Sequence, residues 1–220
     1  KNVNNELIEK ELIASFSIEG PFQSQFEFDY IHAERVGLRF NENLSDIDGN
    51  TSLFNENQIQ FTSSAFLNNR TYLSFNLNIG DKVDYLNNRL GDLIESTGNL
   101  TIFVTDHLEF DFSQTYSKLD ATEDEHKINV YIANISELRL SYQFDVYSYL
   151  KLSLIHNNVE YSNEEPMKDL STKLIYAYKL NPQTVFFLGY SDNSYQDLHL
   201  AKLTRADRVF FTKISYAWII

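Results

Sequence analysis

The stretch DRVFFTKISYAWII, residues 207–220, decides the fold class. Every second position carries a large apolar or aromatic side chain or a threonine: Phe210, Thr212, Ile214, Tyr216, Trp218 and Ile220. The positions between them include Lys213, Ser215 and Ala217. Side chains of a β-strand point alternately to opposite faces. The stretch therefore predicts a long strand with one aromatic-rich, apolar face.

A chain that ends on such a strand resembles the closing strand of a bacterial outer-membrane β-barrel. Five of its residues form the candidate signal by which the barrel assembly machinery recognises such chains: Phe210, Ile214, Tyr216, Trp218 and Ile220. A terminal Phe is usual in that signal, whereas this sequence has Ile220.

The same alternation recurs along the chain in eleven segments, at about 7–19, 22–36, 58–67, 70–85, 100–104, 108–116, 130–142, 150–154, 173–180, 184–192 and 207–220. Most are longer than the strands of soluble sheets. Tight turns are predicted to alternate with longer polar loops, at 37–55, 86–99, 120–125 and before the last strand, and outer-membrane barrels show this asymmetry. The alternative is a soluble β-sandwich or solenoid, in which the apolar face would form a core.

The sequence thus predicts an all-β fold, an antiparallel transmembrane β-barrel, with residues 1–220 as a single domain. Single-chain bacterial barrels normally have an even number of strands. The predicted count of eleven strands therefore means that one strand is miscounted or that further strands lie upstream. We expect the segment to be the C-terminal portion of a longer, even-stranded barrel in the outer membrane of a Gram-negative bacterium.

Composition excludes several function classes. The net charge of −13 and pI of about 4.7 argue against a nucleic-acid partner, which needs a basic surface. The chain has no cysteine, so it has neither disulfides nor thiolate chemistry. No hydrolase motif occurs and the five histidines are scattered, so we expect neither an enzyme nor a cofactor.

From about residue 84 to 220, the stretches DYLNNRLGD, ELRLSYQF, KLIYAYKLNPQTVFFLGYSD and RVFFTKISYAW are similar to a known family region. They resemble the C-terminal barrel-like domain of unknown function in large bacterial outer-membrane proteins, behind a family-9-type carbohydrate-binding module. The resemblance implies an outer-membrane location and an association with glycan biology. It supplies no catalytic residues, and the binding module itself is not in these 220 residues.

Charged residues fall on the faces opposite the apolar ones. If the apolar faces contact lipid, ten charged residues are predicted to line the lumen: Glu27, Asp29, Glu109, Asp111, Glu137, Arg139, Lys151, Lys173, Lys179 and Lys213. An acidic wall facing a basic wall would select polar or charged solutes. The alternative is that these charges pair with one another, or with a plug, and only satisfy a polar interior.

A second candidate site lies in the first long loop, where Asp46, Asp48 and Asn50 resemble half of a calcium-binding loop. The further ligands at the required spacing are missing, so a solvated turn is the competing interpretation and no metal is predicted. The acidic residues of 120–125 are likewise interpreted as a solvated loop.

Two functions remain open. One is a channel or translocation pore with a polar, charge-lined lumen. The other is a membrane anchor or scaffold with a plugged lumen, which holds a carbohydrate-binding domain or a partner protein. The expected partners are outer-membrane lipid, the barrel assembly machinery and other subunits of an outer-membrane complex.

Overall fold

A computed structural model describes residues 9–37, 53–123, 125–162, 166–181, 184–196, 200 and 202–216. These residues form one antiparallel sheet of eleven strands in sequence order. The strands are β1 (Glu9–Gly20), β2 (Ser24–Val36), β3 (Leu53–Asn68), β4 (Thr71–Asp84), β5 (Arg89–Phe103), β6 (Leu108–Glu123), β7 (His126–Gln143), β8 (Ser148–Tyr161), β9 (Met167–Asn181), β10 (Thr184–Gln196) and β11 (Thr204–Tyr216). The all-β prediction and the count of eleven are confirmed.

The sheet has one apolar face and one polar face, because the alternation of all eleven strands is in phase. Residues directly opposite each other on neighbouring strands point to the same side of a sheet. On the apolar face, Phe16 pairs with Phe28 and Phe28 with Phe61, and the last two rings lie 4.8 Å apart. On the polar face, Asp111 pairs with Arg139 and Arg139 with Ser153.

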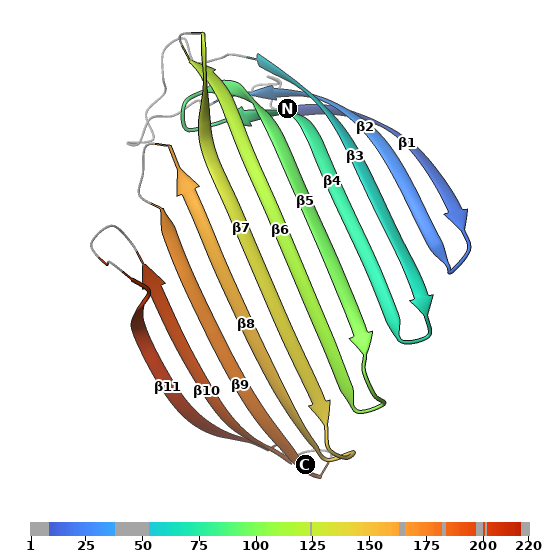
Figure 1. Ribbon diagram of the computed structural model, residues 1–220, viewed down its shortest axis with the longest axis vertical. Coiled ribbons are helices and arrows are strands. Elements are labelled where there is room, and N and C mark those ends of the chain that lie inside the picture. The colour runs from blue at the N-terminus through green and yellow to red at the C-terminus, as the bar shows by residue number, and fades with distance from the viewer. Residues whose placement is uncertain are drawn as a thin grey trace.

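The polar face is the concave side of the sheet. Side chains converge on a concave surface and splay apart on a convex one. Most of the buried apolar side chains are accordingly on the polar face: Ala33, Leu93, Leu119, Ala121 and Ala177. On the apolar face, Leu12, Ile59 and Phe210 are more than 60% exposed. The sheet is therefore curved in the sense of a barrel whose outside is apolar, and the curvature is visible in Figure 1.

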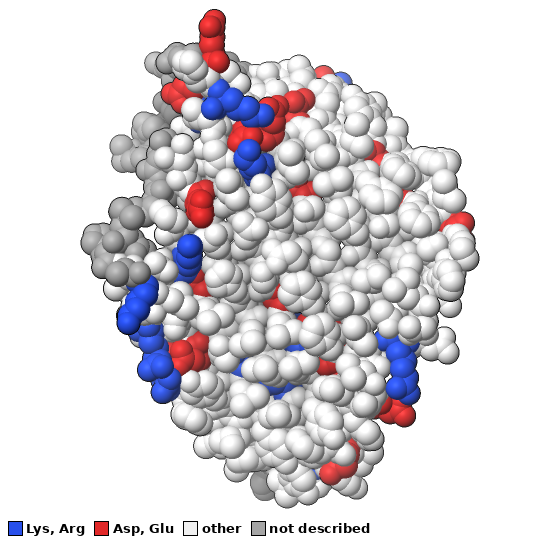
Figure 2. All heavy atoms as spheres, viewed as in Figure 1, with Lys and Arg blue, Asp and Glu red and all other residues white. Residues whose placement is uncertain are grey.

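Figure 2 shows the side of the sheet seen in Figure 1, which is largely free of charged side chains across its middle. Lys, Arg, Asp and Glu gather towards its margins. An outer-membrane barrel is expected to present such an uncharged band, with polar residues above and below it.

The apolar band runs obliquely across the strands. One row of cross-strand partners begins with Ile18 and Phe26, passes Phe75 on β4, and reaches Gln114 and His156 on β6 and β8. A band at constant membrane depth crosses tilted strands at successively different residues. The tilt of about 35–45° that barrel strands adopt accounts for this displacement.

Two predicted loops are in fact strand. Residues 89–99 belong to β5, and β6 continues to Glu123, so the connections there are only 85–88 and 124–125. Asn, Ser and Gly are tolerated in these strands because one face of the sheet is polar and each strand is paired on both sides. The asymmetry of connection lengths is weaker than predicted, since only 37–52 and 197–203 are markedly long.

Two members of the acidic cluster predicted as a solvated loop, Asp120 and Glu123, belong to strand β6. Asp120 is buried at the end of β6, where it accepts hydrogen bonds from Lys118 (2.7 Å) and Asn129 (2.9 Å). Glu123 accepts one from Arg89 at 2.8 Å. These carboxylates join neighbouring strands.

β1 and β11 are the two edges of the sheet, and neither pairs with a second neighbour within the described residues. The strands alternate in direction, so β1 and β11 run the same way. Both end on the side of the turns 21–23 and 69–70, which we call the short-turn side (Figure 1). An antiparallel pairing of β1 directly with β11 is therefore impossible.

Candidate lumen face

All ten charged residues predicted to line the lumen lie on the polar, concave face. Their cross-strand partners show this: Glu109 pairs with Ser141, which pairs with Lys151, and Ser153 pairs with Lys173. The acidic members come from β2, β6 and β7, and the basic members from β7, β8, β9 and β11. Among these ten residues the anions thus lie on β2 to β7 and the cations on β7 to β11, and β7 carries the boundary.

The acidic side is held in place by neighbouring strands. Asp111 accepts a 2.7 Å hydrogen bond from the Thr101 hydroxyl. The Glu137 carboxylate lies 2.7 Å from the Arg139 guanidinium. One carboxylate oxygen of Asp29 is buried and has no hydrogen-bond partner in the described part of the chain. Asp29, Glu109, Asp111 and Glu137 are half-buried, while Glu27 is exposed.

The basic residues make few contacts with neighbouring side chains. All five cations are exposed. Lys151 lies over the Tyr149 ring at 5.3 Å. Among the described residues, Lys173, Lys179 and Lys213 form no ion pair, so the ten residues are joined to one another by the single pair Glu137–Arg139. Within the described part of the chain, these ten residues therefore do not neutralise one another as a set.

Neutral polar side chains fill the rest of the polar face and bond across the strands. These bonds include Asn76 to Thr62 (2.8 Å), Asn78 to Gln58 (3.1 Å), Thr97 with Thr115 (3.1 Å), Asn99 to Ser74 (3.0 Å) and Ser171 to Asn193 (2.7 Å). Such side chains keep the surface wettable without adding charge.

Nearer the long-connection side, an ion-pair network crosses the first strands of the polar face. Glu56 is almost fully buried; its carboxylate lies 2.8 Å from the Arg35 Nε and accepts the Val83 N–H at 2.7 Å. Arg35 also contacts Glu9 and Glu11 at 3.0 and 3.1 Å. The sequence did not single out these residues, because Glu56 carries no local signal that distinguishes it from an exposed glutamate.

The remaining predicted residues divide by position. Phe210, Ile214 and Tyr216 lie on the apolar face of β11, as the alternation predicts, and Tyr190 packs on Phe210 at 4.9 Å. Trp218 and Ile220 lie outside the described residues, as do the calcium candidates Asp46, Asp48 and Asn50. No cluster of three or more metal-ligating side chains occurs in the described ranges. No helix in them is long and apolar enough to cross a membrane.

Comparison with solved structures finds the same architecture in a channel. The chain is similar to the outer membrane channel DcaP of Acinetobacter baumannii, with a TM-score of 0.63 over 94% of this chain and 10% sequence identity. The chain spans 62% of the length of that channel. At this identity the likeness shows the fold, that of a β-barrel. No protein-family model and no curated protein matches the sequence.

The resemblance to the domain behind a carbohydrate-binding module therefore stays a prediction, as do the glycan association and the Gram-negative origin. The partners and the absence of enzymatic activity also stay predictions.

Proposed function

We propose that the protein is an outer-membrane β-barrel channel for polar or charged solutes, and that the polar face of the sheet lines its lumen. The observation that carries this proposal is the two-sided sheet. Its convex face is apolar, while its concave face is polar, and the ten predicted lumen residues on it divide into acidic ones on β2 to β7 and basic ones on β7 to β11. The likeness to a solved outer-membrane channel supports a barrel fold and an outer-membrane location for this chain.

A lumen with opposed charges exerts a transverse field on a solute. The exposed lysines stand on β8, β9 and β11, whereas Asp29 and Asp111 stand on β2 and β6, so a dipolar or zwitterionic solute would be oriented as it passes. Because Lys173, Lys179 and Lys213 have no ion-pair partner among the described residues, their charges are available to solutes.

Barrel closure needs strands beyond these eleven. β1 and β11 run in the same direction, so an odd number of further strands must stand between them for every pair to be antiparallel. An odd addition also makes the total even, as in single-chain bacterial barrels. The 38% of the neighbour's length that this chain does not span is consistent with such an addition. A second copy of the same eleven strands would not serve, since β11 would meet a parallel β1.

Conductance in planar bilayers tests the channel. The purified full-length protein should give stepwise, ohmic current increments. Lys173→Glu should shift the reversal potential in a salt gradient towards cation selectivity, and Asp111→Lys should shift it towards anions. Insertion without current would favour the second candidate, a plugged anchor or scaffold; the exposed lysines of the concave face, which have no ion-pair partner among the described residues, argue against it.

A further inference from the structure

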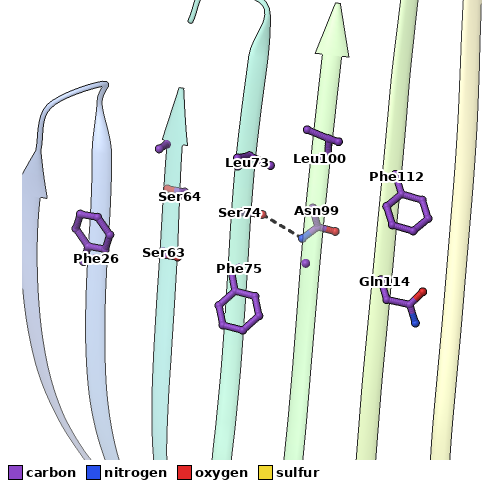
Figure 3. A pocket seen from close by; sticks show the side chains of 12 residues that line it. Phe26, Ser63, Ser64, Leu73, Ser74, Phe75, Asn99, Leu100, Phe112 and Gln114 are labelled. Carbon is purple, nitrogen blue, oxygen red and sulfur yellow. Dashed lines mark hydrogen bonds between the residues drawn. The ribbon is translucent and has the colours of Figure 1, made fainter. Parts of the chain in front are cut away.

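The apolar face carries a groove of about 500 Å³ across β2 to β6. Phe26, Phe75 and Phe112 stand around it, as Figure 3 shows, and Ser63 lies between the first two. The lining is mostly hydrocarbon. Ser74 and Asn99 also line the groove, but their side chains bond to each other at 3.0 Å on the polar face (Figure 3).

The floor of the groove contains a glycine that the fold does not require. A Cβ added at Gly98 would meet no atom within 4 Å, whereas at each other described glycine it would come within 2.6 Å of a neighbouring atom. Glycine weakens a strand interior, and it often marks a place where a ligand approaches the backbone closely. Gly98 keeps space open on a surface where a larger side chain would fit.

A second hollow lies next along the same strands, towards the short-turn side. Leu73 and Leu100 line the groove as a cross-strand pair, and the next pair on the same face is Thr71 with Ile102. That second pair lines the second hollow, which has a volume of about 700 Å³. Arg70 also lines this hollow, at the turn between β3 and β4. Figure 2 shows basic and acidic side chains together at this margin.

The Arg70 guanidinium can accept a second anionic partner. One of its Nη atoms lies 2.6 Å from Asp106, and both side chains are more than half exposed. A guanidinium has five N–H donors in a fork that matches phosphate geometry, so a single carboxylate does not saturate it. Asp106 would compete with a phosphate for the same group.

We propose that this groove binds one phospholipid of the leaflet on the short-turn side, with an acyl chain over Gly98 and the phosphate on Arg70. The inference rests on the proposed membrane barrel. Gly98 pairs with Phe75, five residues from Arg70, which is a span of about 17 Å along a strand. One leaflet contributes roughly 15 Å to the hydrocarbon core, so the spacing fits a chain that ends near the bilayer midplane.

The arrangement favours a lipid over a second barrel. The site combines a narrow apolar groove with a cation at headgroup level, which is the chemistry of one acyl chain and its phosphate. Contact with a second copy of the chain would need neither the empty space over Gly98 nor an arginine near the end of the groove.

Native mass spectrometry of the full-length protein in detergent, titrated with dioleoylphosphatidylglycerol, tests the site. Gly98→Leu fills the groove, and Arg70→Gln removes the cation. Each should weaken the affinity by about tenfold, because one removes the apolar contact and the other a charge-assisted bond. Asp106→Asn should tighten binding, an effect that a merely structural role of Arg70 would not produce. The matched controls are Ser96→Leu on the same strand and face, and Lys10→Gln at the opposite end of the barrel; both should leave binding unchanged.

Unchanged lipid affinity in Gly98→Leu and Arg70→Gln would overturn the proposal. Loss of a dimer or trimer in Gly98→Leu, with lipid binding unaltered, would also overturn it and assign the groove to contact between copies. A Cβ at position 98 meets no atom within 4 Å, and Arg70→Gln alters an exposed side chain in a turn, so at least one of the two variants should fold and report on lipid binding. A wild-type protein that inserts and conducts but binds no lipid saturably contradicts this inference alone. A wild-type protein that does not enter micelles or bilayers contradicts the proposed function as well.

Discussion

Glu137 and Arg139 stand two residues apart on β7, and their side chains meet at 2.7 Å on the concave face, with Asp111 directly across from Arg139 on β6. Of the ten predicted lumen residues, Arg139 is therefore the one cation that lies beside the acidic members. It sits where the anionic strands give way to the lysine-bearing ones.

Arg139→Gln should increase cation selectivity more than a single lysine substitution on the open side. It removes a positive charge and also releases the half-buried Glu137 from its partner. Glu137→Gln should act in the opposite direction. Reversal potentials in a salt gradient measure both. Equal selectivity in the two variants would mean that β7 does not border the conducting path.

The two faces of β8 can be compared at adjacent residues. Leu152→Arg places a charge on the apolar face and should lower the free energy of unfolding in bilayers by about 2–4 kcal/mol. Ser153→Arg, one residue further on, faces the polar side and should cost less than about 1 kcal/mol. Denaturant unfolding in lipid vesicles measures the difference, and the opposite order would mean that the faces are reversed.

Two glycines of neighbouring strands should respond in opposite ways to alanine. At Gly80, φ is 149° and a Cβ would lie 2.1 Å from the Asn57 carbonyl oxygen, so Gly80→Ala should destabilise the fold by about 1–3 kcal/mol. At Gly98 nothing opposes a methyl group, and Gly98→Ala should stabilise by about 0.5–1 kcal/mol. Thermal or denaturant unfolding in detergent measures the stability of both variants. A comparable loss of stability in the two would contradict the open space at Gly98.

The turn between β7 and β8, residues 144–147, should make a pH-dependent contribution to the free energy of unfolding. Hydrogen bonds from the backbone N–H of Tyr147 (2.7 Å) and Ser148 (2.8 Å) hold the pKa of Asp145 below its usual range. A lowered pKa stabilises the fold above the unfolded value of about 3.9, and this stabilisation is lost as pH falls through the folded value. The difference in unfolding free energy between wild type and Asp145→Asn should therefore be constant at neutral pH and shrink below about pH 4. A difference that grows on acidification would contradict the assignment.

The pattern of alternation was sufficient to predict eleven strands, because each barrel strand is apolar on one side and polar on the other. It was not sufficient for β5, where Ser96 and Gly98 interrupt the apolar row between Ile94 and Leu100. Those two residues lack apolar bulk, so residues 86–99 looked like a loop. β-Strand pairing on both sides holds this segment extended in spite of its composition.

The groove and the ion-pair network could not be found from the sequence, since both depend on register. Ser63 and Gly98 are 35 positions apart and become neighbours of Phe75 only through the pairing of β3, β4 and β5. Arg35 and Glu56 meet across β2 and β3 in the same way. By contrast, the ten lumen candidates could be assigned to one face, because alternation alone decides which side of a strand a residue takes.

The measurement that tests the central claim most directly is thiol accessibility along β8. The protein has no cysteine, so single substitutions at Leu150, Lys151, Leu152, Ser153 and Leu154 can each be labelled without background. In lipid vesicles, a small charged methanethiosulfonate reagent should modify Lys151→Cys and Ser153→Cys rapidly and the three leucine-to-cysteine variants slowly, with a period of two residues. Rapid modification of the former leucine positions, or no alternation, would contradict a water-filled lumen lined by the polar face.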